Sequence, residues 1–250
     1  MVRFNDKILE VRANKFRDRL GISNADPIDL YKVLNELNVL TNFRPMGPEF
    51  SGMALKAGEN RFILVNSGQT RARQHFTIGH ELYHLFVQPE FSFKLCKAGR
   101  FDKKDREEYN ADVFSSFLLM PEAGVLSCIP EEELARGGQI SLPTIVKLEQ
   151  HFGVSRRALL VRLDKLGLID YDYYSANYLT GIKRSANELG YSTRLYESGS
   201  DYKVIGDYGT ICKKLFEEEK ISESHYFNLM LDIGVNIDEK FEENEDEWCT

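Results

Sequence analysis

The feature that most constrains this chain is a pair of histidines four residues apart in a segment whose pattern predicts a helix. The segment RQHFTIGHELYHLF runs from Arg73 to Phe86 and carries His80, Glu81 and His84. Residues four apart project from one helical face about one turn from each other, so both imidazoles can approach one cation. A glutamate directly after the first histidine is normally not a ligand, but takes a proton from water at the metal's open position. The sequence therefore predicts a hydrolytic metal site on this helix.

The residues around the motif favour a buried helix with defined ends. The loop before it supplies N-cap candidates at Asn66, Ser67, Gly68 and Thr70. Val87, Gln88 and Pro89 are expected to end the helix. The segment carries several large apolar side chains: Phe76, Ile78, Leu82, Leu85 and Phe86. On this window alone, two structural histidines on an ordinary amphipathic helix remain the alternative.

A catalytic zinc site needs a third protein ligand, which an acidic helix expected over residues 103–120 can supply. On this helix Glu108 shares a face with Ala111 and Ser115, at spacings of three and four. Because those two side chains are small, the two helices can approach closely. Glu108 is therefore expected to complete the coordination, with Glu107 as the competing ligand.

A second carboxylate on the same face is expected to orient the ligands. Asp112 lies one turn beyond Glu108, so it can accept a hydrogen bond from the distal nitrogen of His80 or His84. Two imidazoles and a carboxylate make Zn²⁺ the expected cofactor, and the same donor set also suits Mn²⁺ or iron. The sequence leaves several candidates for an oxyanion stabiliser besides the metal: Arg73, His75 and Tyr83.

The two helices together resemble the paired signature of a known peptidase family. RQHFTIGHELYH and, after a loop, EYNADVFSSFLLMP are similar to the ImmA/IrrE family of bacterial metallo-endopeptidases, as is SGMALKAGENRFILVNSGQTR at residues 51–71. The resemblance covers residues 25–170 well. It implies a gluzincin-like fold and cleavage of a helix-turn-helix (XRE-like) transcriptional repressor, which relieves repression in a stress response or in phage and mobile-element regulation. His75 and Tyr83 depart from the family pattern, where a basic residue and a glycine are frequent.

Three short β-prone runs precede the motif helix, at residues 39–43, 52–56 and 61–65. A small sheet packed on the metal-binding helix would give an α+β, zincin-like peptidase domain. Such a sheet could leave an edge for an extended substrate peptide, and residues 50–53 are the candidate for it. The alternative for these four residues is a hairpin that serves only the core. Residues 89–104 show no clear period and are expected to form a loop near the site, as a lid or a passive connection.

Residues 141–166 predict a helix-turn-helix-like pair, with Ser141 and Ser155 as N-caps and a glycine-bearing turn between the helices. Five basic side chains against two acidic ones give this unit a net charge of +3. Direct DNA contact is one interpretation. Docking of the repressor through Arg156 and Arg157 is the preferred one. The expected domains are a peptidase domain at 1–130, this helical unit at 131–168, and a helical region with an acidic tail at 169–250.

Composition limits the remaining function classes. No run of eighteen apolar residues predicts a transmembrane helix, and the acid-bearing N-terminal segment is unlike an export signal, so a cytoplasmic protein is expected. Four scattered cysteines are expected to be free thiols, and residues 238–247 to be disordered. The net charge of −7 gives no whole-protein attraction to nucleic acid. Two alternatives to a peptidase remain: a non-proteolytic regulator that binds DNA or a repressor, and a metal-stabilised structural domain.

Overall fold

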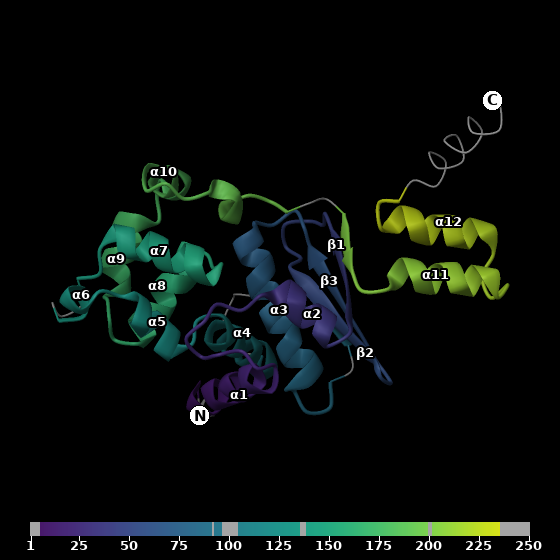
Figure 1. Cartoon of the computed structure of the whole chain (residues 1–250), viewed down its shortest axis with the longest axis horizontal. Helices are drawn as coiled ribbons and strands as arrows, with labels where there is room; N and C mark the ends of the chain where they lie inside the picture. The colour runs from purple at the N-terminus through teal and green to yellow at the C-terminus, as the bar shows by residue number, and fades with distance from the viewer. Residues whose placement is uncertain (1–5, 92, 97–104, 136–138, 200–201, 236–250) are drawn as a thin grey trace.

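The computed structural model describes residues 6–91, 93–96, 105–135, 139–199 and 202–235, and it has a mixed α+β architecture (Figure 1). The strands are β1 (Val39–Arg44), β2 (Gly52–Ala57), β3 (Asn60–Asn66), β4 (Phe93–Cys96) and β5 (Lys203–Ile205). The helices are α1 (Asp6–Arg19), α2 (Leu30–Glu36), α3 (Arg71–Phe86), α4 (Arg106–Leu119), α5 (Glu122–Cys128), α6 (Glu131–Ala135), α7 (Leu142–Phe152), α8 (Arg156–Lys165), α9 (Tyr171–Tyr178), α10 (Ile182–Glu188), α11 (Tyr208–Glu217), α12 (Glu223–Asp232) and the 3-10 helix η1 (Thr193–Tyr196).

The five strands form one sheet in the order β4-β2-β3-β1-β5. β1 runs parallel to β3, whereas β2 runs antiparallel to both β3 and β4. The three strands predicted from the sequence are therefore present. The prediction of an open substrate edge at residues 50–53 is wrong, because β2 is paired on both sides and β4 is the outer strand. β4 is only four residues long, too short for its alternation to be distinguished from a loop, and it lies within the segment expected to be a loop.

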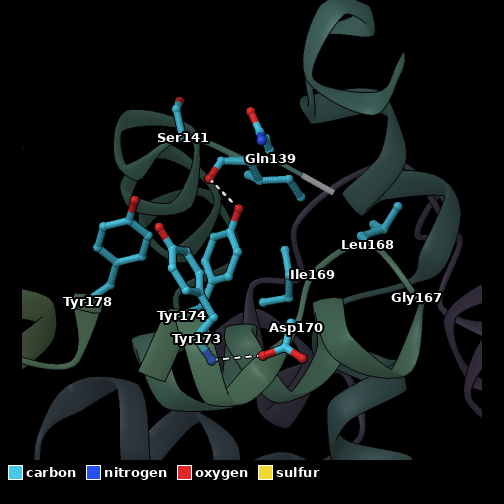
Figure 2. Close-up of a pocket in the computed structure, with 10 residues that line it drawn as sticks. Gln139, Ser141, Gly167, Leu168, Ile169, Asp170, Tyr173, Tyr174 and Tyr178 are labelled. Carbon is cyan, nitrogen blue, oxygen red and sulfur yellow. Dashed lines mark hydrogen bonds between the residues drawn. The ribbon is translucent and has the colours of Figure 1, made fainter. Parts of the chain in front are cut away.

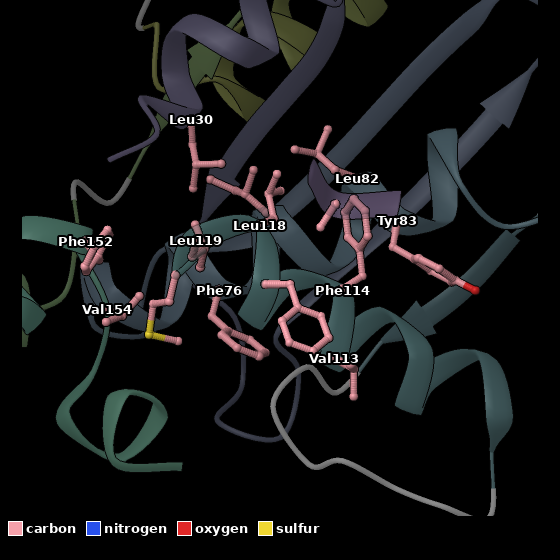
Figure 3. Packing of buried hydrophobic residues seen from close by; sticks show 14 of the residues in the cluster. Leu30, Phe76, Leu82, Tyr83, Val113, Phe114, Leu118, Leu119, Phe152 and Val154 are labelled. Carbon is pink, nitrogen blue, oxygen red and sulfur yellow. The ribbon is translucent and has the colours of Figure 1, made fainter. Parts of the chain in front are cut away.

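The core lies where α3 packs against β2, β3 and α4, and α1 also packs on α4. Figure 3 shows side chains of α3 and α4 meeting in this core, close to Leu30 of α2. The buried apolar residues there include Phe76, Leu82, Val113, Phe114, Leu118 and Leu119. α3 is thus held on both faces, which fixes the direction in which its polar residues project.

The segment expected to be a helix-turn-helix-like pair forms α7 and α8, which pack on each other. Ser141 and Ser155 cap them as predicted, and Gly153 ends α7 at φ 64°, a left-handed conformation that glycine adopts without strain. Arg156, however, is not available for docking. Its side chain is buried and pairs with Glu149, so only Arg157 of the two arginines is exposed.

Buried residues of one cluster come from both sides of residue 130, for example Val125 and Ile145, and the domain division at that residue stays a prediction. α11 and α12 pack on each other beyond β5, on the opposite side of the sheet from α5–α10 (Figure 1). Among the described residues no single helix has the length and apolar composition of a membrane span. Taken together, α4 and α5 have that length and composition, but they are bent by 43° where they meet. Cys128 and Cys212 are free thiols. The expected disorder at 238–247 lies outside the described residues.

A cavity of about 540 Å³ lies between the start of α7 and the start of α9. Figure 2 shows the aromatic rings of Tyr173, Tyr174 and Tyr178 on one side of it. The hydroxyl of Tyr174 donates to the carbonyl oxygen of Ile140 at 2.9 Å, and the Asp170 carboxylate caps α9 through the backbone N–H of Tyr173. The bond from Tyr174 holds α9 against the segment that enters α7.

Candidate metal centre

α3 begins and ends where the sequence predicts. The Thr70 hydroxyl accepts from the backbone N–H of Arg73, and Val87 follows the last helical residue. Between these ends the helix carries His80, Glu81 and His84, all with no exposed surface. A helix with this many buried polar groups must satisfy them internally or with a bound ligand.

α4 brings its acidic face to α3 through a close helix–helix contact. A Cβ atom on Gly79 would lie 2.5 Å from Oγ of Ser115, so α4 could not stay in place beside a larger residue. The Ser115 hydroxyl donates to the carbonyl oxygen of Phe76 at 2.8 Å, which ties the helices together at the same level. At the start of α4, Asp105 caps the helix through the backbone N–H of Glu108. Ser115 thus allows the close approach that the sequence predicts, together with Gly79 of α3, which the sequence analysis did not single out.

The three predicted ligands converge. Nε2 of His80 lies 3.1 Å from Nε2 of His84, and these nitrogens lie 3.4 and 3.5 Å from the two carboxylate oxygens of Glu108. The ligand atoms of all three residues lie within 4.8 Å of one another. Ligands on a tetrahedral zinc ion, with bonds of about 2.0–2.1 Å, are about 3.3 Å apart. The separations found here therefore fit one cation of that size.

The hydrogen bonds behind the ligands support the same conclusion. Nδ1 of His80 lies 2.8 Å from the Asp112 carboxylate, and Nδ1 of His84 lies 2.5 Å from Oε1 of Gln88. Both partners accept, so each neutral imidazole places its proton on Nδ1 and leaves a lone pair on Nε2. Two lone pairs and a carboxylate then face each other in a buried space. Two imidazole nitrogens and a carboxylate facing one another are a donor set that fits a divalent cation.

Glu107 points to a different partner. Its carboxylate accepts from the hydroxyl of Tyr83 at 2.7 Å, and burial together with this contact raises the pKa of Tyr83 far above its ordinary value. Glu107, the competing ligand, therefore pairs with Tyr83, and Glu108 is the carboxylate that joins the two histidines. Of the oxyanion candidates, the Tyr83 hydroxyl is engaged here and His75 bonds to the carbonyl of Gly153 at 2.9 Å.

Comparison with known proteins agrees with this geometry. The model of the IrrE N-terminal-like domain, peptidase family M78, matches residues 34–164, more than half of the chain. The chain belongs to this family. It is also 27% identical over 156 residues to the phage-like element PBSX protein XkdA of Bacillus subtilis (strain 168), across 62% of this chain and 71% of that protein. The resemblance predicted from the sequence is confirmed, and membership of the M78 family points to a metallopeptidase.

Glu81 of this M78 peptidase lies directly beneath β2. A Cβ atom on Gly52 would come within 3.1 Å of its Oε1 and within 2.5 Å of Cγ2 of Thr77, so α3 and the strand are in close contact. The sequence did not single out two residues at the site, Gln88 and Phe91. The ring of Phe91 stacks on His84, with centroids 5.2 Å apart. Gln88 could have been found, since it lies one helical turn after His84, whereas Phe91 gives no such signal.

Proposed function

We propose that the chain is a metal-dependent endopeptidase that cleaves a helix-turn-helix (XRE-like) transcriptional repressor and so relieves repression. The observation that carries the peptidase assignment is the convergence of His80, His84 and Glu108, with their hydrogen bonds placing acceptors inward. Zn²⁺ is the proposed cofactor because of the ligand types, with Mn²⁺ as the alternative. When bound, the cation would lower the pKa of a water molecule and polarise the scissile carbonyl.

The remaining steps fall to side chains of this chain. Glu81 takes a proton from the attacking water and delivers it to the departing amine. Glu81 lies next to the ligand His80 and beneath β2. This position supports the role, because a peptide bound at the metal would lie close to its carboxylate. Asp112 holds the ring of His80, and Gln88 that of His84, so that Nε2 of each ring faces the cation.

The repressor as substrate is proposed from the ImmA/IrrE membership, and the name of the XkdA relative, a phage-element protein, is compatible with it. Docking is proposed through α7 and α8, where Arg157 is exposed, as are Lys147 and Lys165. Direct DNA binding by residues 141–166 is the less favoured interpretation, because the net positive charge there is small and Arg156 is paired with Glu149.

The test is Glu81→Gln with the purified protein, zinc or manganese, and the repressor encoded nearest its gene. We expect wild type to give two discrete repressor fragments by mass spectrometry. The variant should bind metal as wild type does and should lose about 10²–10⁴-fold in rate, because the amide cannot accept the proton. Glu59→Gln, in the exposed turn between β2 and β3, is the matched control and should cleave normally. Normal turnover by Glu81→Gln would contradict the role; repressor binding without cleavage by either protein would favour a non-proteolytic regulator.

A further inference from the structure

The strand above Glu81 has no open edge. Gly52 places β2 nearest to the Glu81 carboxylate, yet β2 is paired with β3 on one side and with β4 on the other. β4 runs antiparallel to β2, with Cys96 opposite Gly52 and Leu95 opposite Met53. The backbone of β4 therefore uses the hydrogen-bonding edge at the level of the site. An extended peptide that adds to β2 would need that same edge.

The candidate active site is also covered. His80, Glu81 and His84 have no exposed surface, and only 15% of the Glu108 side chain is exposed. Phe91, which precedes β4, stacks on His84 with an angle of 26° between the ring planes. Because Glu81 is fully buried, a scissile carbonyl cannot reach it in this conformation. Some part of the covering chain must move before a substrate is cleaved.

We propose that β4 and Phe91, called here the β4 strap, act as an internal substrate mimic that holds the peptidase closed. An extended segment of the protein substrate displaces β4 and pairs with β2 in its place, which brings the scissile bond to Glu81. This inference rests on the proposed peptidase function, and it names the regulation of that site and the form of its substrate.

The geometry of the sheet makes β4 the strand to displace. β4 has four residues and pairs with a single neighbour, whereas β2 and β3 each have two. A substrate strand would make the same kind of backbone ladder that β4 gives up, so the exchange costs few hydrogen bonds. The other edge strand, β5, pairs with β1 and is separated from β2 by two strands. The measured activity should then follow the fraction of molecules in which β4 has detached.

Proline substitutions at adjacent positions of β4 test this idea. Successive residues of an edge strand alternately point their N–H groups toward the neighbour and away from it. Of Lys94→Pro and Leu95→Pro, one therefore removes a ladder donor to β2, and the other serves as its matched control. Lys94→Thr and Leu95→Val keep every N–H group and are further controls. With zinc-loaded protein and labelled β-casein, we expect one proline variant to cleave about tenfold faster than wild type. Equal rates for wild type and both proline variants, at equal metal content and helicity, would overturn the proposal.

A reversible lock gives the reciprocal test. Met53 and Leu95 are directly opposite in an antiparallel ladder, where Cα atoms lie about 4.5–5.5 Å apart, within disulfide range. Met53→Cys with Leu95→Cys, in a Cys96→Ser background, should be inactive on casein and repressor when oxidised. Reduction should restore the rate of the Cys96→Ser parent. Equal cleavage by the oxidised and reduced forms would show that β4 need not leave β2.

The outcomes separate this inference from the proposed function. If wild type and all the β4 variants cleave at the same rate, and Glu81→Gln abolishes cleavage, the peptidase assignment is supported and the β4 strap proposal is wrong. If a proline variant cleaves faster than wild type, and adding Glu81→Gln to that variant abolishes cleavage, both the peptidase function and the β4 strap are supported. If no metal-loaded protein, the proline variants included, cleaves casein or the repressor, both are wrong.

Discussion

Two clusters of buried polar side chains in this protein differ in how their charges are balanced. In one, between α7 and α8, the guanidinium of Arg156 donates through Nε and Nη2 to the Glu149 carboxylate at 3.1 and 2.6 Å. Tyr196 donates its hydroxyl to the same carboxylate at 2.6 Å, and Arg156 also donates to Ser185 and to the carbonyl of Tyr178. Donors and acceptors match within this cluster.

The other cluster, between α3 and α4, directs its hydrogen-bond donors outward. The Nδ1–H groups of His80 and His84 donate outward to Asp112 and Gln88, which leaves Nε2 of both rings and the Glu108 carboxylate facing inward. Imidazole nitrogens and a carboxylate are the ligand types that a divalent cation takes, and these three could hold one. Burial alone therefore does not separate a structural polar cluster from a functional one. What separates the two clusters is whether their hydrogen-bond donors point into the cluster or out of it. Removing single members of each cluster tests this difference.

The largest effect is expected from Arg156→Met. This change leaves the Glu149 carboxylate buried with little compensation, and its pKa, already raised by burial, should rise further because the arginine that opposes this shift is lost. We expect a loss of about 3–5 kcal/mol in the free energy of unfolding, measured by urea denaturation. The loss should be the same with zinc and with a chelator, since the pair is not a metal ligand.

Two further variants sharpen this result. Arg157→Met, at the exposed neighbouring position, should change stability by no more than about 0.5 kcal/mol. Arg156→Met combined with Glu149→Met should recover part of the loss, because no unpaired charge remains. A metal-dependent loss in Arg156→Met, or none, would remove the contrast between the two clusters.

A smaller effect, on metal affinity instead of folding, is expected from Asp112→Asn. The amide oxygen can still accept from Nδ1 of His80, but the negative charge behind the ring is lost. We expect zinc affinity to fall about 10–100-fold in a competition titration with a chromophoric chelator. The matched control is Asp172→Asn, on the exposed surface of α9, and it should leave the affinity unchanged. Wild-type affinity in Asp112→Asn would mean that His80 is oriented by its packing alone.

Much of the second cluster could be predicted from sequence because its geometry is local. A spacing of four residues fixes His80 and His84 on one face of α3, and the same rule places Glu108 and Asp112 on one face of α4. The small residues at the α3–α4 contact then allow the two faces to meet. The prediction left open which histidine Asp112 would contact, because the offset between two helices is set by packing across the whole core.

What could not be predicted depends on pairing between distant segments. Arg156 looked like a docking side chain because nothing local shows that Tyr178 and Ser185, from α9 and α10, enclose it with Glu149. β4 looked like a loop because four residues carry little periodic signal, and its place beside β2 is decided only in the folded sheet. Glu107 looked like a competing ligand because its partner, Tyr83, is on another helix.

The smallest effect is expected at His75, which joins α3 to the turn between α7 and α8 and so lies between the two clusters. Burial lowers the pKa of the ring, and this outweighs the donation from its Nδ1–H group to the carbonyl of Gly153, which raises the pKa. Because the pKa in the folded protein lies below the unfolded value of about 6.5, the unfolded chain binds the proton more readily. The stability contribution of His75 is therefore present above pH 6.5 and is lost as the pH falls below it.

His75→Gln keeps an N–H donor for Gly153 but cannot titrate. We expect the free energy of unfolding of wild type to fall more than that of His75→Gln between pH 7.5 and 5.5, while groups common to both proteins cancel in the difference. His151→Gln, on the exposed side of α7, is the control and should follow wild type. Parallel pH profiles for wild type and His75→Gln would mean that water reaches the ring and that α3 is less firmly held by the α7–α8 turn than the 2.9 Å contact implies.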